Sequence, residues 1–426
     1  MILALFAVFI LLMITGLPIA FVLGITSLIM LAFYSATPLI MIPDVMFNSL
    51  NSFSLMAVPF FVIAAQFMLR GGTSKYLIRA ADCYVRHFWG GLAIVCVIGC
   101  MIFAAICGSS VATALSMGVI IIPAMIKGGY PRSFATGVVA ASGTMGIMIP
   151  PSIALILYGI ITEESIPRLF LAGIIPGILE ATMYIGWICF YSRKKGFRGG
   201  EKASGKETFS ATVKAMPALS LPFIVLGGIY TGIVTVTEAA SLSAVAAIII
   251  SIFIYREVKF REILPITAEA MKSAGMIMII ITTAVVFGHW ITEEGLPAKL
   301  VDFAAQMNLS AISFLIFINI LLLFLGTFLE VVSIMLITLP ILIPVLQHLG
   351  IDLIHFGIIM TVNMEVACIT PPVGLNLFVL SGAARVPLHE VVRGAFPFVI
   401  LGLIEILIIT YLPQIVLFLP NLIMPR

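Results

Sequence analysis

Hydrophobic residues form long runs along this chain, and short polar segments separate them. The runs that predict single membrane-spanning helices, which need about 20 apolar residues, are 17–34, 54–70, 169–191, 217–232, 234–255, 265–291 and 396–420. The run 2–14 forms a hairpin with the helix after it, or continues into it as one kinked helix through Gly16 and Pro18. Charged and apolar positions mix over 73–89 and 296–307, which is typical of helices lying at the membrane surface.

Two apolar blocks, 91–126 and 309–346, are each too long for one span. Small and polar residues stand in the middle of both, at Cys107–Ser110 in the first block and Gly326–Glu330 in the second. Basic residues flank the first block at both ends. We therefore predict re-entrant helical hairpins that enter and leave the membrane on the same side, with a polar tip at mid-membrane.

Adjacent prolines interrupt two further apolar segments, 133–161 at Pro150-Pro151 and 353–383 at Pro371-Pro372. Proline removes a backbone donor and disfavours helical geometry at the residue before it. Each segment is therefore predicted to be two half-helices with unwound backbone between them. In hydrocarbon such a break is tolerated only where protein or a bound solute covers it.

An internal repeat relates the two halves of the chain. A shift of 221 residues places Pro150-Pro151 on Pro371-Pro372, and it also aligns Pro123 with Pro344, Gly129 with Gly350, Gly173 with Gly394 and Pro176 with Pro397. Each half makes an odd number of crossings, so the second half is predicted to be inverted, as in many secondary transporters. The topology expected is ten spans and two hairpins, with both termini on the outer side; one kinked N-terminal helix would put the N-terminus inside.

Composition agrees with a polytopic membrane protein, because 62% of the residues are hydrophobic and only 10% are charged. The longest polar segment, 193–214, is strongly basic and is therefore predicted to be a cytoplasmic loop. The sequence has no nucleotide-binding loop, no Cys/His metal spacing and no nucleophile–base pair. These features exclude ATP-driven transport by this chain and argue against an enzyme, and nothing indicates a nucleic acid partner.

The polar residues at the hairpin tips and the breaks are candidate ligands for a hard cation. Hydroxyls, free carbonyls and a carboxylate are the oxygen ligands that Na⁺ takes at broken helices. A carboxylate at membrane depth is costly, so Glu330 is a functional candidate. The candidate cation ligands are Gly108, Ser109, Ser110, Gly143, Pro150, Gly326, Thr327, Glu330, Thr370 and Pro371.

Half-helix N-termini present free N–H groups and the positive end of the helix dipole, which favour a carboxylate substrate. The candidate substrate contacts beside the two breaks are Ser142, Thr144, Ser152, Asn363, Glu365 and Asn376. The candidate cation ligands and the candidate substrate contacts can also be explained without a ligand. Small residues ease helix packing, and a lone Glu can face an aqueous cleft.

Four motifs in order resemble the large membrane subunit of tripartite ATP-independent periplasmic (TRAP) transporters. They are GSSVATA from Gly108, SGTMGIMIPPS from Ser142, GTFLE from Gly326 and ITPPVGLN from Ile369. The resemblance covers essentially the whole chain; Glu330 stands where the family commonly has Asp. The stretches 48–59 and 164–170 resemble sialic acid members most.

The resemblance implies a sodium-coupled importer of an organic acid, either sialic acid or a C4-dicarboxylate, in a bacterial inner membrane. It implies two or more Na⁺ ions, a small four-helix membrane subunit and a periplasmic substrate-binding protein as partners, and an elevator mechanism. On this basis the halves of a moving transport domain are 91–162 and 309–385. The scaffold, with an arm helix in each of its first two parts, is 1–90, 163–308 and 386–426.

Two other functions are compatible with the same pattern. A stand-alone divalent-anion/sodium symporter of related fold would share the hairpins and breaks, and uptake without a binding protein would favour it. A passive channel or permease subunit has no need of paired hairpins in inverted halves, and gradient-driven accumulation would exclude it.

Overall fold

The computed structural model describes residues 2–35 and 38–425, and within them every regular element is helical. Eight helical segments in this part of the chain are long and apolar enough to cross a membrane. They are Phe53–Arg70, Ser110–Lys127, Ile166–Lys195, Gly205–Tyr230, Val236–Ile254, Phe260–Glu293, Val331–His348 and Leu388–Tyr411. The chain is thus an all-α, multi-pass membrane protein.

The helices of the two halves recur with the spacing that the prolines predicted. In the first half they are α5 (Thr73–Val85), α6 (Gly91–Cys107), α7 (Ser110–Lys127), α8 (Arg132–Thr144), α9 (Ile153–Thr162) and α10 (Ile166–Lys195). In the second half they are α14 (Leu296–Gln306), α15 (Ala311–Gly326), α16 (Val331–His348), α17 (Leu353–Cys368), α18 (Leu375–Ala384) and α19 (Leu388–Tyr411). The first residues of corresponding helices lie 220 to 223 positions apart.

Both long apolar blocks fold as helical hairpins, as predicted. In the first, α6 ends at Gly108, whose φ of +58° suits glycine, and α7 begins after the extended Ser109. In the second, α15 and α16 are joined by residues 327–330, with Glu330 extended before α16. The two helices of each hairpin pack against each other.

Both double prolines break their helices where the sequence predicted. Residues 145–152 separate α8 from α9, and residues 369–374 separate α17 from α18. The Pro150-Pro151 and Pro371-Pro372 peptide bonds are both cis. The Ser152 hydroxyl accepts a hydrogen bond from the Leu155 N–H, at 3.4 Å, and so caps the start of α9.

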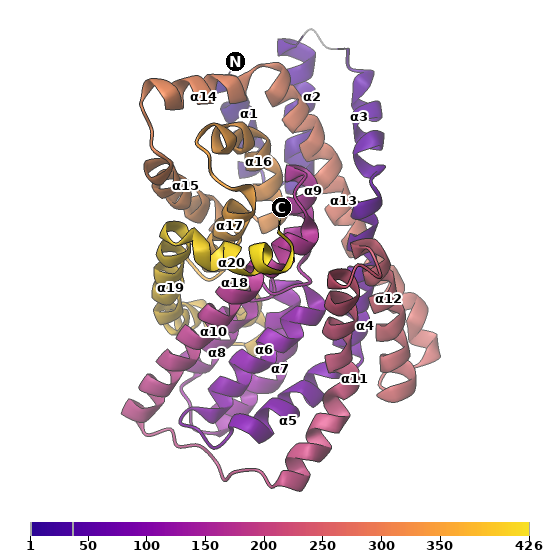
Figure 1. Cartoon of the computed structure of the whole chain (residues 1–426), viewed down its shortest axis with the longest axis vertical. Helices are drawn as coiled ribbons and strands as arrows, with labels where there is room; N and C mark the ends of the chain where they lie inside the picture. The colour runs from indigo at the N-terminus through magenta and orange to yellow at the C-terminus, as the bar shows by residue number, and fades with distance from the viewer. Residues whose placement is uncertain (1, 36–37, 426) are drawn as a thin grey trace.

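The remaining helices surround these hairpins and breaks. They are α1 (Ile2–Ile14), α2 (Ile19–Tyr34), α3 (Met41–Leu50), α4 (Ala57–Arg70), α11 (Gly205–Tyr230), α12 (Val236–Ile249), α13 (Ile263–Glu293) and α20 (Pro413–Ile423), with 3₁₀ turns at Phe53–Met56 and Phe260–Glu262 and a π turn at Ile250–Ile254. Helices α1 and α2 lie side by side (Figure 1), so the N-terminal pair is a hairpin and not one kinked helix.

Two predicted boundaries were wrong. Segment 193–214 is not one loop, because α10 runs through Lys195 and α11 begins at Gly205, where the Ser204 side chain caps its first turn. The span 396–420 is not continuous, since α19 ends at Tyr411 and a separate helix begins at Pro413. A proline at that position disfavours helical geometry at the residue before it.

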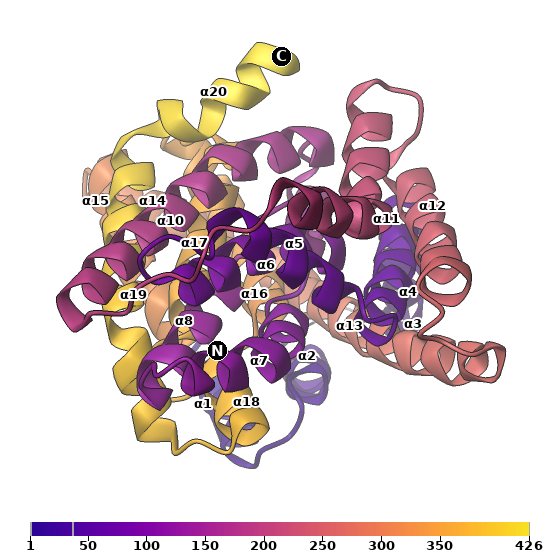
Figure 2. The same ribbon diagram turned by 90° about the horizontal axis from the view of Figure 1, so that it is seen from below.

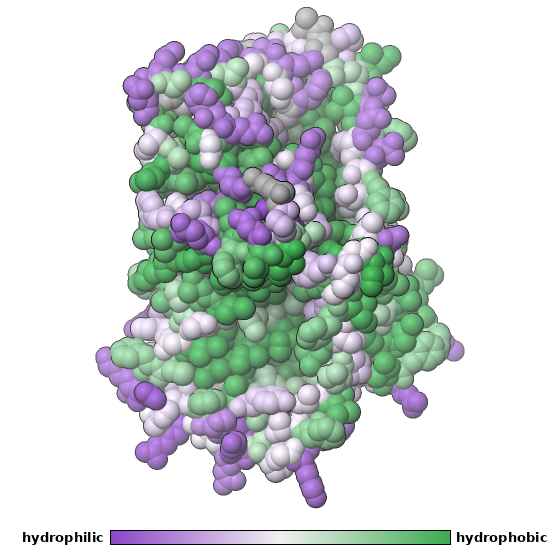
Figure 3. All heavy atoms as spheres, viewed as in Figure 1, coloured by the Kyte–Doolittle hydropathy of each residue, from purple (hydrophilic) through white to green (hydrophobic). Residues whose placement is uncertain are grey.

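The molecule is elongated, and its ends differ from its flanks. Helix α5 and the α10–α11 connection lie at the lower end in Figure 1, whereas α14 lies across the upper end. Hydrophilic residues gather at both ends, and hydrophobic residues cover much of the flank between them on the face shown (Figure 3). Helices α3, α4, α11 and α12 lie to one side of the hairpins in both ribbon views (Figure 2).

Candidate functional site

The tip of the first hairpin fits against the first proline break through glycines. A Cβ atom on Gly108 would lie 2.6 Å from the Pro151 carbonyl oxygen, and one on Gly146 would lie 2.6 Å from the Ser109 carbonyl oxygen. Gly143 similarly packs on Ala114 of α7, at 2.7 Å. Real Cβ atoms do not approach this closely, so only glycine allows the two backbones to meet here.

The tip of the second hairpin fits against the end of α17 in a similar way. A Cβ atom on Gly326 would lie 2.5 Å from the Ala367 Cβ atom. The next residue, Thr327, donates its hydroxyl proton to the Phe324 carbonyl at 2.8 Å. Each hairpin tip is therefore held against unwound or terminal backbone of a broken helix.

The two tips and the two breaks enclose a common cavity of about 110 Å³. Of the predicted site residues, the structure brings four to its wall: Gly108, Ser109, Ser110 and Glu330. The other lining residues, which the prediction missed, are Val111, Ile147, Ile153, Ala154, Ile277, Val331, Val332, Cys368 and Leu375. Most of these adjoin the four motifs and could have been inferred from them, but Ile277 of α13 carries no local signal.

Asn376 connects the second break to the first hairpin. Its side-chain N–H group donates to the Ser110 hydroxyl at 2.7 Å and to the Ala140 carbonyl at 3.2 Å, and the side chain is fully buried. Its carbonyl oxygen Oδ1 has no hydrogen-bond partner. Asn376 therefore ties the start of α7, at the first hairpin tip, to α8, and its Oδ1 atom remains able to accept a hydrogen bond.

The hydroxyl groups beside the breaks donate to nearby backbone carbonyls. Thr370 donates to the Val366 carbonyl at 2.6 Å, Thr144 donates to the Ala141 carbonyl at 2.6 Å, and Ser152 donates to the Ile147 carbonyl. The proton of each hydroxyl is thereby used, while the oxygen retains a lone pair. Such an oxygen can accept a hydrogen bond or bind a cation but cannot donate to a substrate carboxylate.

Several predicted residues do not reach the cavity wall. Gly143, Pro150, Gly326, Thr327, Thr370 and Pro371 support it from behind or beside the breaks, and Ser142, Thr144 and Ser152 are fully buried. Asn363 donates to the Asn319 side-chain oxygen and to the Ile359 carbonyl, both at 2.8 Å, and Asn319 in turn donates to Thr410. Asn363 thus links α17 to α15 and α19.

Glu365 is also away from the cavity wall, among other buried acids. Only 1% of its surface is exposed, and neither carboxylate oxygen has a hydrogen-bond partner. The carboxyl groups of Glu180 on α10 and Glu405 on α19 lie near enough for their charges to interact with it. None of the three forms an ion pair with a basic side chain in the described part of the chain.

The cavity is too small for a whole organic acid in this state. Its volume of about 110 Å³ is well below the ~300 Å³ at which ordinary small-molecule pockets start. Most of its wall is apolar, and its polar side chains are Ser109, Ser110 and Glu330, with the Cys368 thiol beside them. Oxygen ligands of this kind are typical of sites for hard cations, and no group of three or more His, Cys, Asp or Glu residues suited to a metal occurs among the residues described.

Comparison with known proteins identifies the family. Residues 6–415 match the family model described as "Tripartite ATP-independent periplasmic transporter, DctM component". The chain is 40% identical to the C4-dicarboxylate TRAP transporter large permease protein DctM of Rhodobacter capsulatus, over 99% of both proteins. It is 33% identical to the sialic acid TRAP transporter large permease protein SiaM of Vibrio cholerae, over 96% of both.

The fold also has a relative among solved structures. The YdaH transporter of Alcanivorax borkumensis superposes with a TM-score of 0.66 at 13% identity, over 93% of this chain and 96% of that one. At this identity the likeness concerns the fold alone.

Proposed function

The chain belongs to the DctM component family of tripartite ATP-independent periplasmic transporters, and from this premise we propose that it imports an organic acid by sodium-coupled, secondary-active transport. The observation that carries the sodium coupling is the meeting of two hairpin tips and two broken helices around one cavity, where Ser109, Ser110 and Glu330 supply oxygen atoms. Broken helices that meet in this way form the ion and substrate sites of secondary transporters.

The substrate proposed first is a C4-dicarboxylate. The relative named for C4-dicarboxylates is 40% identical to this chain, whereas the one named for sialic acid is 33% identical. The identities therefore favour a dicarboxylate over the sialic acid that two sequence stretches suggested. A carboxylate would bind near the N-termini of the half-helices α9 and α18, where free N–H groups favour an anion.

The proposed partners are those of the family: a small four-helix membrane subunit and a periplasmic substrate-binding protein that delivers the acid. The proposed location is the bacterial inner membrane, with the basic segment 193–214 around the connection 196–204 in the cytoplasm. Helices α5 and α14 correspond in the repeat and lie at opposite ends of the molecule (Figure 1), which supports inverted halves and an N-terminus on the periplasmic side.

In the proposed mechanism, Na⁺ binds at the tips and breaks before or with the substrate. Glu330, which is exposed to the cavity, would supply the charged ligand, and the oxygens of Ser109 and Ser110 would supply neutral ones. A further ion would bind beside the second break, outside this cavity, where the Thr370 hydroxyl oxygen lies. Two or more ions follow from the repeat, since each half offers its own tip and break.

The proposed movement is an elevator, in which the hairpins and broken helices slide together along fixed helices. The packing enlarges the moving body beyond residues 91–162 and 309–385, because α19 packs on α8 and α17, and α10 packs on α6 and α17. We therefore place α10 and α19 in the moving body. Ile277 of α13 then belongs to the fixed wall that the site faces.

The test is uptake by the complete transporter in vesicles, with the binding protein loaded with a radiolabelled C4-dicarboxylate. An inward sodium gradient should drive accumulation. In Ser109→Ala and Thr370→Ala, the sodium concentration for half-maximal uptake should rise about tenfold, as expected for about 1.4 kcal/mol of lost ion binding.

Thr182→Ala is the matched control, because Thr182 also donates to the carbonyl four residues back, at 2.7 Å, but on an exposed face of α10. Its sodium dependence should stay that of the wild type. Uptake that ignores the sodium gradient would overturn the proposal, as would normal sodium dependence in both site variants.

A further inference from the structure

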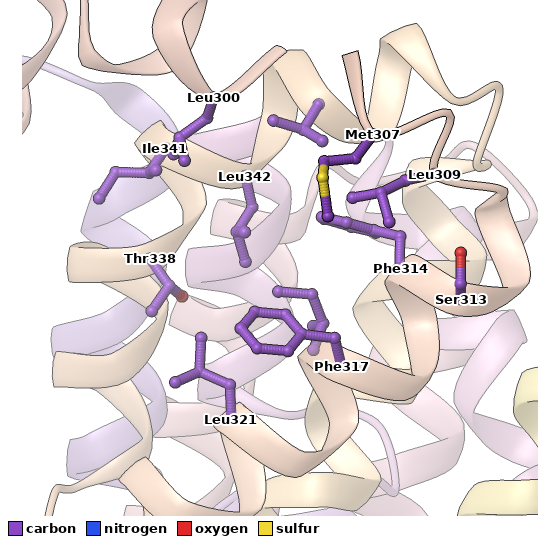
Figure 4. Close-up of a pocket in the computed structure, with 12 residues that line it drawn as sticks. Leu300, Met307, Leu309, Ser313, Phe314, Phe317, Leu321, Thr338, Ile341 and Leu342 are labelled. Carbon is purple, nitrogen blue, oxygen red and sulfur yellow. The ribbon is translucent and has the colours of Figure 1, made fainter. Parts of the chain in front are cut away.

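An apolar groove of about 480 Å³ lies between α14 and the second hairpin, away from the cavity at the hairpin tips. Figure 4 shows side chains from the α14 end and from α15 and α16 pointing toward one space, with Leu300 and Met307 near its top and Phe317 and Leu321 near its base. None of its twelve lining residues is charged. The groove is large enough for a ligand, since small-molecule pockets begin near 300 Å³.

The two polar side chains in the groove need no partner from a ligand. Ser313 donates its hydroxyl proton to the Ser310 carbonyl at 2.9 Å, and Thr338 donates to the Ile334 carbonyl at 2.7 Å. A polar ligand would lose its own hydrogen bonds to water here and meet only the remaining lone pairs of these two hydroxyl oxygens. The groove therefore favours a hydrocarbon occupant along its length.

The groove follows α15 over several turns. Its lining residues on α15 extend from Leu309, just before the helix, to Leu321, a length of about 18 Å at 1.5 Å per helical residue. The groove is also continuous with a surface that faces lipid, because Phe317 itself is 63% exposed and its neighbours Ile316 and Ile320 are 44% and 64% exposed. In a membrane-spanning chain such a surface is covered by acyl chains.

The upper end of the groove suits a lipid headgroup. Helix α14 lies across the end of the molecule (Figure 1), with Lys299, Asp302 and Gln306 exposed. Lys299 precedes the groove residue Leu300, and its ammonium group donates to the Glu294 carbonyl at 3.1 Å, so a positive charge lies at this end of the molecule, where the phosphate of a phospholipid would lie. Leu300 and Ile341 also line a second, wholly apolar cavity of about 260 Å³, which gives the other acyl chain a place.

We propose that this groove binds a membrane phospholipid, with one acyl chain held lengthwise between α14 and the hairpin α15–α16. The lipid would separate the surface helix α14 from the hairpin whose tip bears Glu330. The site is distinct from the solute and ion site, and it does not depend on which acid the protein carries.

The experiment uses the full chain with its small membrane subunit in vesicles of phosphatidylethanolamine and phosphatidylglycerol, doped with a phosphatidylethanolamine that carries a photoreactive group near the end of one acyl chain. After illumination, mass spectrometry should find the lipid attached to residues near the groove base, Phe317, Leu321 or Thr338. Leu321→Phe fills the base and should reduce this labelling roughly tenfold, equivalent to about 1.4 kcal/mol of affinity.

Ile320→Phe is the matched control, since it adds the same ring to the adjacent, lipid-facing position, and it should leave the labelling unchanged. Thermal unfolding of both variants checks that the hairpin still folds. Equal labelling of the wild type and a folded Leu321→Phe would overturn the proposal. So would the absence of groove labelling in the wild type, or cross-links from the groove to the small subunit instead of the lipid.

Discussion

At the residue scale, two features of the structure require glycine at position 108, and experiment can separate them. The φ of Gly108 is +58°, and a Cβ atom there would also meet the Pro151 carbonyl oxygen. Gly129 has a similar φ of +85° but open space around it. Gly129→Ala should lower the free energy of unfolding by only about 1–2 kcal/mol, the cost of left-handed backbone for alanine. Gly108→Ala should lower it by a further ~1–3 kcal/mol, because its Cβ atom overpacks the contact.

Thermal unfolding of the two purified variants measures this difference, and uptake adds a second readout. Gly108→Ala should also abolish most transport, since it pushes the hairpin tip off the break, while Gly129→Ala should transport normally. Equal losses of stability in both variants would show that the tip does not seat on the break as described.

A second prediction concerns Glu365, whose buried carboxylate has no basic partner in the described part of the chain. An ionised carboxylate would be costly at this buried site, and Gln keeps the shape of the side chain without a charge. Glu365→Gln should therefore leave the melting temperature unchanged or higher, and Glu405→Gln should behave alike. A loss of about 3 kcal/mol or more, typical of a broken buried ion pair, would contradict this.

The sequence could identify site residues that a local motif marks, but not the side-chain directions that depend on how the helices pack. The tips at Gly108–Ser110 and Glu330 were predictable, because polar residues in the middle of an overlong apolar block must be covered by something. Asn363 and Glu365 stand two residues apart, on different faces of α17 beside the same motif, yet both side chains lie away from the cavity. Their direction depends on how α17 packs against α10, α15 and α19, which no local pattern records.

At the element scale, α8 and α19 are in backbone contact. A Cβ atom on Gly394 would lie 1.7 Å from the Ser133 carbonyl oxygen, and one on Gly137 would lie 2.2 Å from the Gly394 carbonyl oxygen. Small residues at a crossing let membrane helices approach closely. Gly394→Ala should force the helices apart and cost about 1–3 kcal/mol or more, measured as a lower melting temperature.

Gly186→Ala in α10 is the control for that change, because no atom lies within 4 Å of its added Cβ. Alanine is the better helix former by about 0.5–1 kcal/mol, so this variant should be as stable as the wild type or more so. If both alanine variants had the same melting temperature, the close crossing of α8 and α19 would be refuted.

Helices and breaks were predictable to the extent that prolines and glycines mark them. The Pro-Pro breaks and the hairpins were predicted directly from such residues. The 221-residue offset between the halves then predicted the corresponding elements of the second half. The start of α11 at Gly205 was missed, because its first turns carry Lys206, Glu207 and Lys214 and resemble a loop in composition. A side-chain cap by Ser204 and the long apolar face that follows make this polar segment helical.

At the scale of the whole molecule, the cavity lies on a boundary between two groups of helices. Twelve of its thirteen lining residues come from the hairpins and broken helices, and the other, Ile277, comes from the long helix α13. Helix α13 packs against α2, α3 and α4 on one side and against α16 on another. The wall that the hairpins face thus belongs to the helices that the proposed elevator leaves in place.

This boundary can be locked with a cross-link. Ile277→Cys introduces a thiol across the cavity from the native Cys368, and both positions line the same space of about 110 Å³. A short bifunctional maleimide should join the two thiols, tie α13 to the end of α17, and stop uptake, because the elevator requires these elements to move past each other. Ile277→Cys combined with Cys368→Ala keeps the five other native cysteines but only one thiol at the cavity, so the reagent should leave most of its uptake intact. A cross-linked protein, verified by mass spectrometry, that still transports at the rate of this control would mean that α13 and the broken helix move as one body, and the division into fixed and moving helices would have to be redrawn.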